Sequence, residues 1–159
     1  MAYAKDTQVP VSKSQYDIQY LLKKAGAQQV GTFEDMVNHM AVVCFQHEGL
    51  AITIPVPLPN PSDKAFTHTP SRGTRRTKES AEKEYSTEIN RRWRVMLLLI
   101  KAKLEAIELG FSTVRREFLS DIRLPSGGTV EQWLGSDIEA KYLESGAPAL
   151  GPGFAPPEG

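Results

Sequence analysis

The chain has 159 residues, of which 40% are hydrophobic and 24% are charged, and its formal net charge at pH 7 is zero. This composition is ordinary for a globular domain and excludes collagen-like and highly charged disordered chains. The one cysteine excludes an intramolecular disulfide and fits a reducing compartment. The chain start lacks the apolar core of a signal peptide, and no apolar run is long enough to span a bilayer. We therefore expect an intracellular protein without a membrane partner.

The zero net charge hides a segregation of charge along the chain. Residues 1–70 carry 5 basic and 6 acidic side chains, residues 71–103 carry 10 and 4, and residues 104–159 carry 4 and 9. Because charged partners respond to local fields, the basic middle and the acidic C-terminal part matter more than the overall pI.

The first dozen residues predict an extended arm followed by a short amphipathic helix. Ser12 or Ser14 is the expected N-cap, and Ser14 with Asp17 forms a weak variant of the capping box. The apolar positions of this helix are Ile18, Leu21, Leu22 and Ala25. Gly26 supplies the C-terminal stop.

Residues 28–56 predict a small antiparallel meander. A first strand over 28–33 is followed by a β-rich run over 40–45 and an alternating apolar run over 50–56. The turn over 46–49 places Gly49 where a positive φ is expected, and the prolines from Pro55 onward suit an edge strand. Because Cys44 lies within an apolar strand, we expect a buried, inert thiol.

A segment rich in Pro, Ser, Thr and Arg, at about 57–79, lacks hydrophobic periodicity and predicts a flexible basic loop. A long helix over 80–109 follows, uninterrupted by Gly or Pro until Gly110. Its main apolar row comprises Tyr85, Ile89, Trp93, Met96, Ile100, Leu104 and Ile107, and a narrower opposite row comprises Val95, Leu98, Ala102 and Leu109. A helix that is apolar on two sides is central in its domain or shared with a partner chain, so a homodimer through this helix is one expected assembly.

The C-terminal part predicts two further helices. Ser112 is the expected cap of a short helix whose inward residues are Val114, Phe118, Leu119 and Ile122. After a turn over 124–128, a capping box over 129–132 opens a last helix with Val130, Trp133, Leu134, Ile138 and Leu143 as its apolar side chains. Residues 146–159 predict a disordered Pro/Gly-rich tail.

Together these elements predict an α+β fold in one domain over residues 1–145. The expected architecture is a small antiparallel sheet of two to three strands packed on one long central helix and two to three shorter helices.

Clustered cations provide the strongest functional indication. They are Arg72, Arg75, Arg76 and Lys78 in the loop and Arg91, Arg94 and Lys101 on the long helix. Arginines on a loop beside a basic helix are typical of contact with a phosphate backbone, and Trp93 among arginines offers a stacking surface. The alternative is a solvated or protein-facing basic surface, in which Glu88 pairs with neighbouring arginines, Lys101 pairs with Glu105, and Trp93 lies in the core.

Arg92 and Lys103 lie on the edge of the main apolar row, where an unpaired, half-buried charge is costly. We expect these two cations to pair with acidic residues of the last helix, namely Glu131, Asp137 or Glu139.

No catalytic or metal-binding motif stands out. His39, His47 and His68 lack any metal-ligand spacing, and no Gly-rich phosphate loop is present. The sequence therefore predicts a protein that is not an enzyme and needs no cofactor or metal, and an enzyme that uses the loop as a lid is the weakest alternative.

Several stretches together resemble a set of small proteins of tailed bacteriophages and prophages that have no assigned activity. They are 3–11, Leu58-Pro59 with 69–71, 92–94 running into 99–106, 122–125 and 129–134. The resemblance implies a phage origin and a role in the host cytoplasm during infection, and it brings no site residues. We therefore expect a non-enzymatic accessory protein that binds nucleic acid or a nucleic-acid-processing complex. The alternative is a protein–protein inhibitor of a host defence system, such as an anti-CRISPR, whose acidic C-terminal surface mimics nucleic acid.

Overall fold

The structure is a computed structural model that describes residues 8–148. Its elements are α1 (Val11–Lys24), β1 (Gln28–Asp35), β2 (Met40–His47), β3 (Leu50–Pro57), α2 (Lys64–Thr67), α3 (Lys78–Glu108), α4 (Val114–Glu117), the 3-10 helix η1 (Leu119–Asp121) and α5 (Val130–Ser145). The predicted α+β class is confirmed. The start of the predicted arm (1–7) and most of the predicted tail (149–159) lie outside the described residues.

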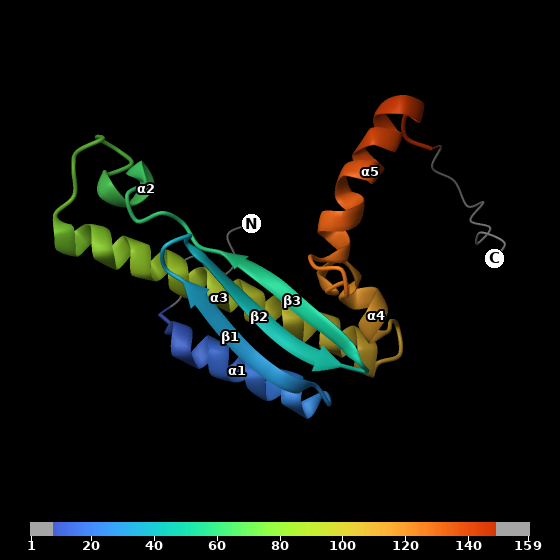
Figure 1. The fold of residues 1–159 in the computed structure, drawn as a ribbon. Coiled ribbons are helices and arrows are strands. Elements are labelled where there is room, and N and C mark those ends of the chain that lie inside the picture. The colour runs from blue at the N-terminus through green and yellow to red at the C-terminus, as the bar shows by residue number, and fades with distance from the viewer. Residues whose placement is uncertain (1–7, 149–159) are drawn as a thin grey trace.

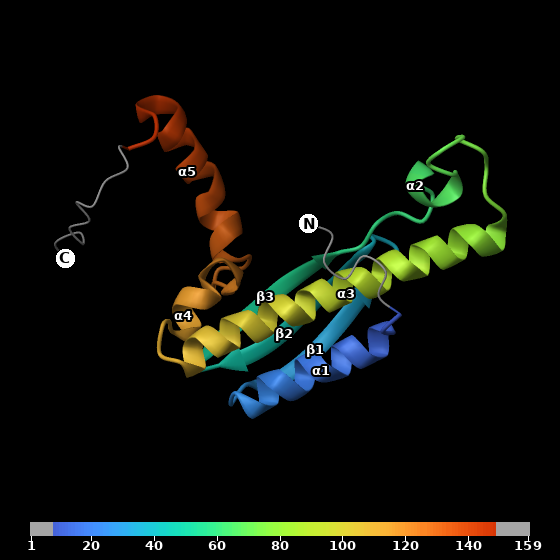
Figure 2. The same cartoon turned by 180° about the vertical axis from the view of Figure 1, so that it is seen from behind.

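The three strands form an antiparallel sheet in the order β1-β2-β3, and α1 and α3 cover one of its faces (Figures 1 and 2). The covered face carries the buried side chains Ala41, Val43, Phe45, Ile52, Ile54 and Val56. These residues alternate with exposed or half-buried ones, because successive side chains of a strand point to opposite faces. The sheet therefore has one covered face and one open face.

A two-residue turn joins β2 to β3, with Glu48 at φ 51° and Gly49 at φ 78°. Positive φ at both positions is the conformation that matches the twist of a tight hairpin, so the predicted turn is confirmed. The outer edge of β3 begins with a hydrogen bond of 2.8 Å from the Arg123 N–H to the Ala51 carbonyl. Odd-numbered residues of β3 therefore direct their backbone groups away from β2. Pro55 and Pro57 have no backbone N–H, but at these positions no N–H is needed for the pairing with β2.

The long helix α3 extends over 31 residues, and the Thr77 hydroxyl caps it by accepting from the Ser80 N–H at 3.2 Å. Its buried side chains are Trp93, Met96, Leu97 and Ile100, which form the core with residues of α1, the sheet and α4. The predicted helix and main row are confirmed. Since Trp93 is 0% exposed, the hypothesis that it offers a stacking surface is wrong.

The predicted cap of α1 is wrong. The helix begins at Val11 with Pro10 in the N-cap position, so that Ser12 and Ser14 lie inside its first turn. Pro10 has the extended backbone of an N-cap (φ −68°, ψ 154°), and its carbonyl accepts from the N–H groups of Lys13 and Ser14 at 3.1 and 3.3 Å, so the helix begins without a side-chain cap. Ser14 is consequently buried in the core.

The segment predicted as a flexible, unstructured loop contains ordered elements. Phe66 of α2 is buried and packs edge-on against Tyr85 of α3, with ring centroids 5.5 Å apart. A β-bridge then pairs His68 with Arg75. One aromatic anchor between prolines has no periodicity, which is why the sequence pattern did not predict this structure.

At the C-terminal side, the cap of α4 is Thr113 rather than Ser112, since the Thr113 hydroxyl accepts from the Arg116 N–H at 3.2 Å. Val114 and Phe118 are buried as predicted, whereas Leu119 is 49% exposed. The capping box of α5 is confirmed, with Thr129 and Gln132 bonding each other's backbone N–H groups.

The packing predicted for α5 is wrong. None of its residues is buried, and Trp133, Ile138 and Leu143 are 64%, 52% and 88% exposed. In Figures 1 and 2 the helix points away from the sheet and from α3. The β-bridge between Arg123 and Thr129 and the bond from the Val130 N–H to the Ile122 carbonyl (3.0 Å) hold its start in this direction.

Candidate binding surfaces

The segment 67–76 forms a closed turn, here called the basic hairpin. Its backbone bonds run from the Arg76 N–H to the Thr67 carbonyl (2.7 Å), from Thr69 N–H to Thr74 (2.8 Å) and from Gly73 N–H to Thr69 (2.9 Å). Gly73 has φ 62°, a value that glycine adopts without a steric penalty. The basic hairpin lies beyond α2 at the N-terminal end of α3 (Figure 1). Arg72 and Arg75 are exposed on this ordered tip.

Arg76 and Lys78 differ from the two arginines at the tip because they contact acidic residues of α3. The Arg76 guanidinium lies 3.4 Å from Glu84 and donates from Nε to the His68 carbonyl at 3.2 Å. The Lys78 ammonium lies 4.0 Å from Glu82. Arg76 therefore attaches the basic hairpin to α3, and much of its charge is already compensated.

The helix cations Arg91, Arg94 and Lys101 lie on the outward side of α3, within roughly 80° of arc. Arg91 donates to Glu88 at 3.2 Å. Within residues 8–148, Arg94 and Lys101 form no ion pair, so the expected pair of Lys101 with Glu105 is absent there. Lys101 instead borders a hollow of about 530 Å³ whose lining also includes Glu48, Glu105 and Glu108. Lys24 also lines this hollow, so three carboxylates outnumber two ammonium groups there, a balance that does not favour a phosphate.

The predicted site residues therefore do not form one patch. Lys78 and Lys101 are separated by 23 residues of helix, which is roughly 35 Å. Arg72 and Arg75 form one group at the tip, Arg91 and Arg94 lie farther along α3, and Lys101 lies close to its C-terminal end.

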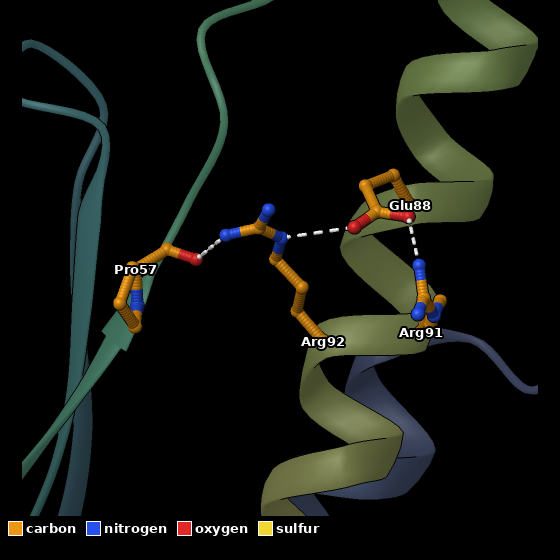
Figure 3. Close-up of polar contacts among 4 residues, drawn as sticks. All are labelled: Pro57, Glu88, Arg91 and Arg92. Atoms are coloured by element: carbon orange, nitrogen blue, oxygen red, sulfur yellow. Dashed lines mark hydrogen bonds and ion pairs between the residues drawn. The ribbon is translucent and has the colours of Figure 1, made fainter. Parts of the chain in front are cut away.

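The partners expected for Arg92 and Lys103 are wrong. Arg92 donates to Glu88 (3.1 Å) and to the Pro57 carbonyl (2.6 Å), so one carboxylate is shared by two neighbouring arginines (Figure 3). The Lys103 ammonium donates to the Glu117 backbone carbonyl and lies 3.8 Å from the Glu117 carboxylate. Acidic residues of α5 do not reach these cations because α5 points away.

Two of the three histidines have structural partners, whereas Nδ1 of His39 is buried without a hydrogen-bond partner in residues 8–148. His47 Nε2 lies 2.8 Å from the Ala25 carbonyl, and His68 Nδ1 lies 2.8 Å from the Thr67 hydroxyl. Among the described residues, no group of three or more His, Cys, Asp and Glu side chains is placed to hold a metal ion. Residues 8–148 also contain no helix that combines the length and the apolar character needed to cross a membrane.

Two carboxyl groups have a shifted pKa. Burial raises the pKa of Asp121, Lys103 opposes that shift, and Glu131 adds to it. Hydrogen bonds from Asn38 lower the pKa of the exposed Asp35, with a smaller contribution from Val37. Asp35 accepts from the N–H groups of Val37 and Asn38 at 3.0 Å each, and so it closes the turn between β1 and β2.

The open face of the sheet is a surface that the sequence pattern did not single out. Cross-strand pairing places its residues in rows: Asp35–Met40–Pro57, Phe33–Val42–Pro55, Gly31–Cys44–Thr53 and Gln28–Gln46–Ala51. Phe33 is 63% exposed, and Cys44 is partly exposed, so the prediction of a buried thiol is wrong. The free face of an antiparallel sheet is ordinarily polar, whereas Asp35 is the one charged residue in these rows.

A comparison of the chain with protein-family models, curated proteins and solved structures finds no match. The surfaces described above therefore carry the functional interpretation by themselves.

Proposed function

We propose that the chain is a non-catalytic binding protein that contacts nucleic acid, alone or within a nucleic-acid-processing complex, through the basic hairpin. The phage setting of this proposal comes from the sequence resemblance. The observation that carries the proposal is the contrast among the cations. Arg76, Lys78 and Arg91 have acidic neighbours, whereas Arg72 and Arg75 are exposed and form no ion pair within residues 8–148.

Several properties of the basic hairpin support contact with phosphates. Each of the two guanidinium groups on this short turn can donate two parallel hydrogen bonds to the oxygens of one phosphate. The backbone bonds of the turn reduce the conformational entropy that is lost on binding. Arg94 lies farther along the outward side of α3 and is the candidate for a second, orienting contact.

Because the charges of α3 nearly cancel, we expect the protein to neutralise only a few phosphates. The helix carries seven basic and six acidic side chains, so little net attraction comes from its length. Two to three neutralised phosphates predict a slope of roughly −2 to −3 in a plot of log affinity against log salt for duplex DNA. Binding by the basic hairpin is therefore expected to be weak and independent of base sequence.

The first test measures binding of labelled single- and double-stranded DNA and RNA at ~50 and ~200 mM salt. The double variant Arg72→Ala/Arg75→Ala should reduce the salt slope by about 2 for duplex DNA, because two phosphate contacts are lost. The matched control is Arg115→Ala/Arg116→Ala, which removes the same charge from the exposed surface of α4 near the other end of α3 (Figure 1). Equal losses in the two variants, or no binding at ~50 mM salt, would contradict the proposal.

A second candidate function is inhibition of a host defence complex through α5. The observation that favours it is that α5 carries Glu131, Asp137, Glu139 and Glu144 against the single cation Lys141, together with exposed apolar side chains. Such a surface resembles the negative charge of nucleic acid. Competition between the chain and DNA for a purified defence nuclease would test it, and replacing the four acidic residues by their amides should abolish competition.

A further inference from the structure

We propose that the open face of the sheet is a homodimer interface, in which two copies pack face to face through β2 and its neighbours. This inference concerns a different surface from the basic hairpin and does not depend on the proposed function. It begins from the rows of the open face, where Phe33, Val42 and Pro55 lie side by side across all three strands. The next row adds Cys44, and the preceding row adds Met40.

The apolar character of this face is contiguous. Phe33 and Met40 are 63% and 47% exposed on this face, and Val37, in the turn that joins β1 to β2, is 86% exposed, whereas Met36 borders a hollow beside Val11, Tyr85 and Ile89 on the helix side. The Phe33 ring lies over the strand backbone, since a Cβ built on Gly31 would meet it at 3.3 Å. Scattered apolar side chains are normal at a protein surface, but a contiguous patch marks an interaction site.

The charge pattern of the open face favours a second copy of the chain over nucleic acid as the partner. The rows contain no Lys, Arg or Glu, and Asp35 lies at the margin with its carboxylate already bonded to Val37 and Asn38. A face without cations does not suit nucleic acid, and Pro55 and Pro57 prevent the addition of a strand at the β3 edge. In a two-fold dimer a surface must be complementary to itself, and an apolar face without charge at its centre meets that requirement.

The size of the face agrees with a reversible dimer. Three strands of eight residues span roughly 27 Å by 14 Å, given about 3.4 Å per residue and 4.8 Å between strands. Two such flat faces amount to roughly 760 Å², and side-chain relief raises the buried total to roughly 1,000 Å², which is in the range of weak, transient interfaces. The resulting layers are helices, sheet, sheet and helices, so each sheet is covered on both sides.

The chain offers a direct probe of this arrangement, because Cys44 is its only cysteine and lies on the middle strand of the open face. Since packed sheets lie about 10 Å apart, a bis-maleimide of about that length should link two Cys44 thiols at the centre of the dimer. Any covalent dimer must join Cys44 to Cys44. Cys44→Ser should yield none.

Sedimentation velocity between about 1 and 200 µM protein should show a concentration-dependent dimer. Val42→Lys places two like charges at the centre of the interface and should weaken the dimer about 100-fold. Phe33→Glu, at an exposed position of the edge strand, is a second variant that keeps the test valid if Val42→Lys unfolds. The matched control Val95→Lys changes an exposed apolar residue of α3 and should leave the dimer intact.

Two results would overturn the inference. One is a monomer at every concentration without a cross-linked product. The other is a dimer that survives both Val42→Lys and Phe33→Glu. Loss of that dimer in Val95→Lys would place the interface on the second apolar row of α3.

Discussion

Residues 8–148 contain six side-chain polar atoms that are buried without a hydrogen-bond partner, and two of these atoms belong to fully buried residues. They are Ser14 Oγ on α1 and Trp93 Nε1 on α3, and both residues are 0% exposed. A buried donor or acceptor that loses its bonds to water raises the free energy of the folded state. Trp93 offsets this cost by the large apolar area that its ring buries, whereas Ser14 has little apolar area to offer.

Replacing Ser14 by Ala should therefore stabilise the protein. The expected gain is about 1 kcal/mol, seen as a melting temperature higher by about 3 °C in a thermal denaturation scan. Ser12→Ala is the matched control, because Ser12 is exposed in the same turn of α1 and reports the helix propensity alone. If Ser14→Ala gains no more than Ser12→Ala, an ordered water satisfies the hydroxyl.

Asp121 should make stability depend on pH. Burial raises its pKa in the folded state above the ordinary value, so folding favours the neutral form and ionisation weakens the fold. The stability that neutral Asp121 contributes is fully present below its ordinary pKa and is lost as the pH rises through its pKa in the folded state. Asp121→Asn should thus raise the melting temperature by about 2 °C at pH 7, with little change near pH 3.

The control for this measurement is Asp137→Asn, on the exposed surface of α5. It removes the same formal charge without removing a buried carboxylate. A larger gain for Asp121→Asn at low pH than at pH 7 would contradict the assignment, and so would equal gains for the two variants at pH 7.

At the scale of the elements, α5 contributes no buried residue and is joined to the remainder through η1 and the bridge between Arg123 and Thr129. Removing residues 130–159 should therefore leave the α1–sheet–α3 core folded. Tryptophan fluorescence checks this, because Trp93 is 0% and Trp133 is 64% exposed. The shortened protein should keep only the emission that acrylamide quenches poorly. Loss of cooperative unfolding would instead assign α5 to the core.

The elements that sequence predicted well are those with a repeating apolar pattern. The alternation in β3 and the unbroken helical spacing of α3 both predict which side chains are buried. The capping box at Thr129 predicted the start of α5 for the same local reason. The packing of α5 was not predictable. Apolar helix residues such as Trp133 and Ile138 indicate that a contact is possible, but they do not identify the surface that is contacted.

The candidate site was only partly predictable from the sequence. Counting cations located Arg72 and Arg75, but it did not separate them from Arg76, whose partner Glu84 comes from a different segment. The open face was missed because its rows bring together residues of three strands, such as Phe33, Val42 and Pro55, that are distant in sequence. Cross-strand register was needed to see them as one surface.

For the whole molecule, the two proposed surfaces lie on different parts. The basic hairpin extends past the sheet at one end of α3, and the open face lies opposite the α1–α3 layer (Figures 1 and 2). A face-to-face dimer would thus carry two basic hairpins on one particle. Two weak contacts on one particle raise the apparent affinity for a long strand without any new contact. Both proposals can hold together, and each can fail without the other.

The 31 residues of α3 also set a length. At 1.5 Å per residue the helix is about 46 Å long, which corresponds to about 14 base pairs of B-form duplex. Arg72 and Arg75 lie beside the N-terminal end of α3, and Glu105 and Glu108 lie near its C-terminal end. A duplex of about ten base pairs would contact only the cationic end of α3. A duplex of about twenty base pairs aligned with α3 would also be repelled by the carboxylates at the other end. If the basic hairpin binds nucleic acid as proposed, each hairpin should therefore contact a terminus or a short stem rather than align α3 with an extended duplex.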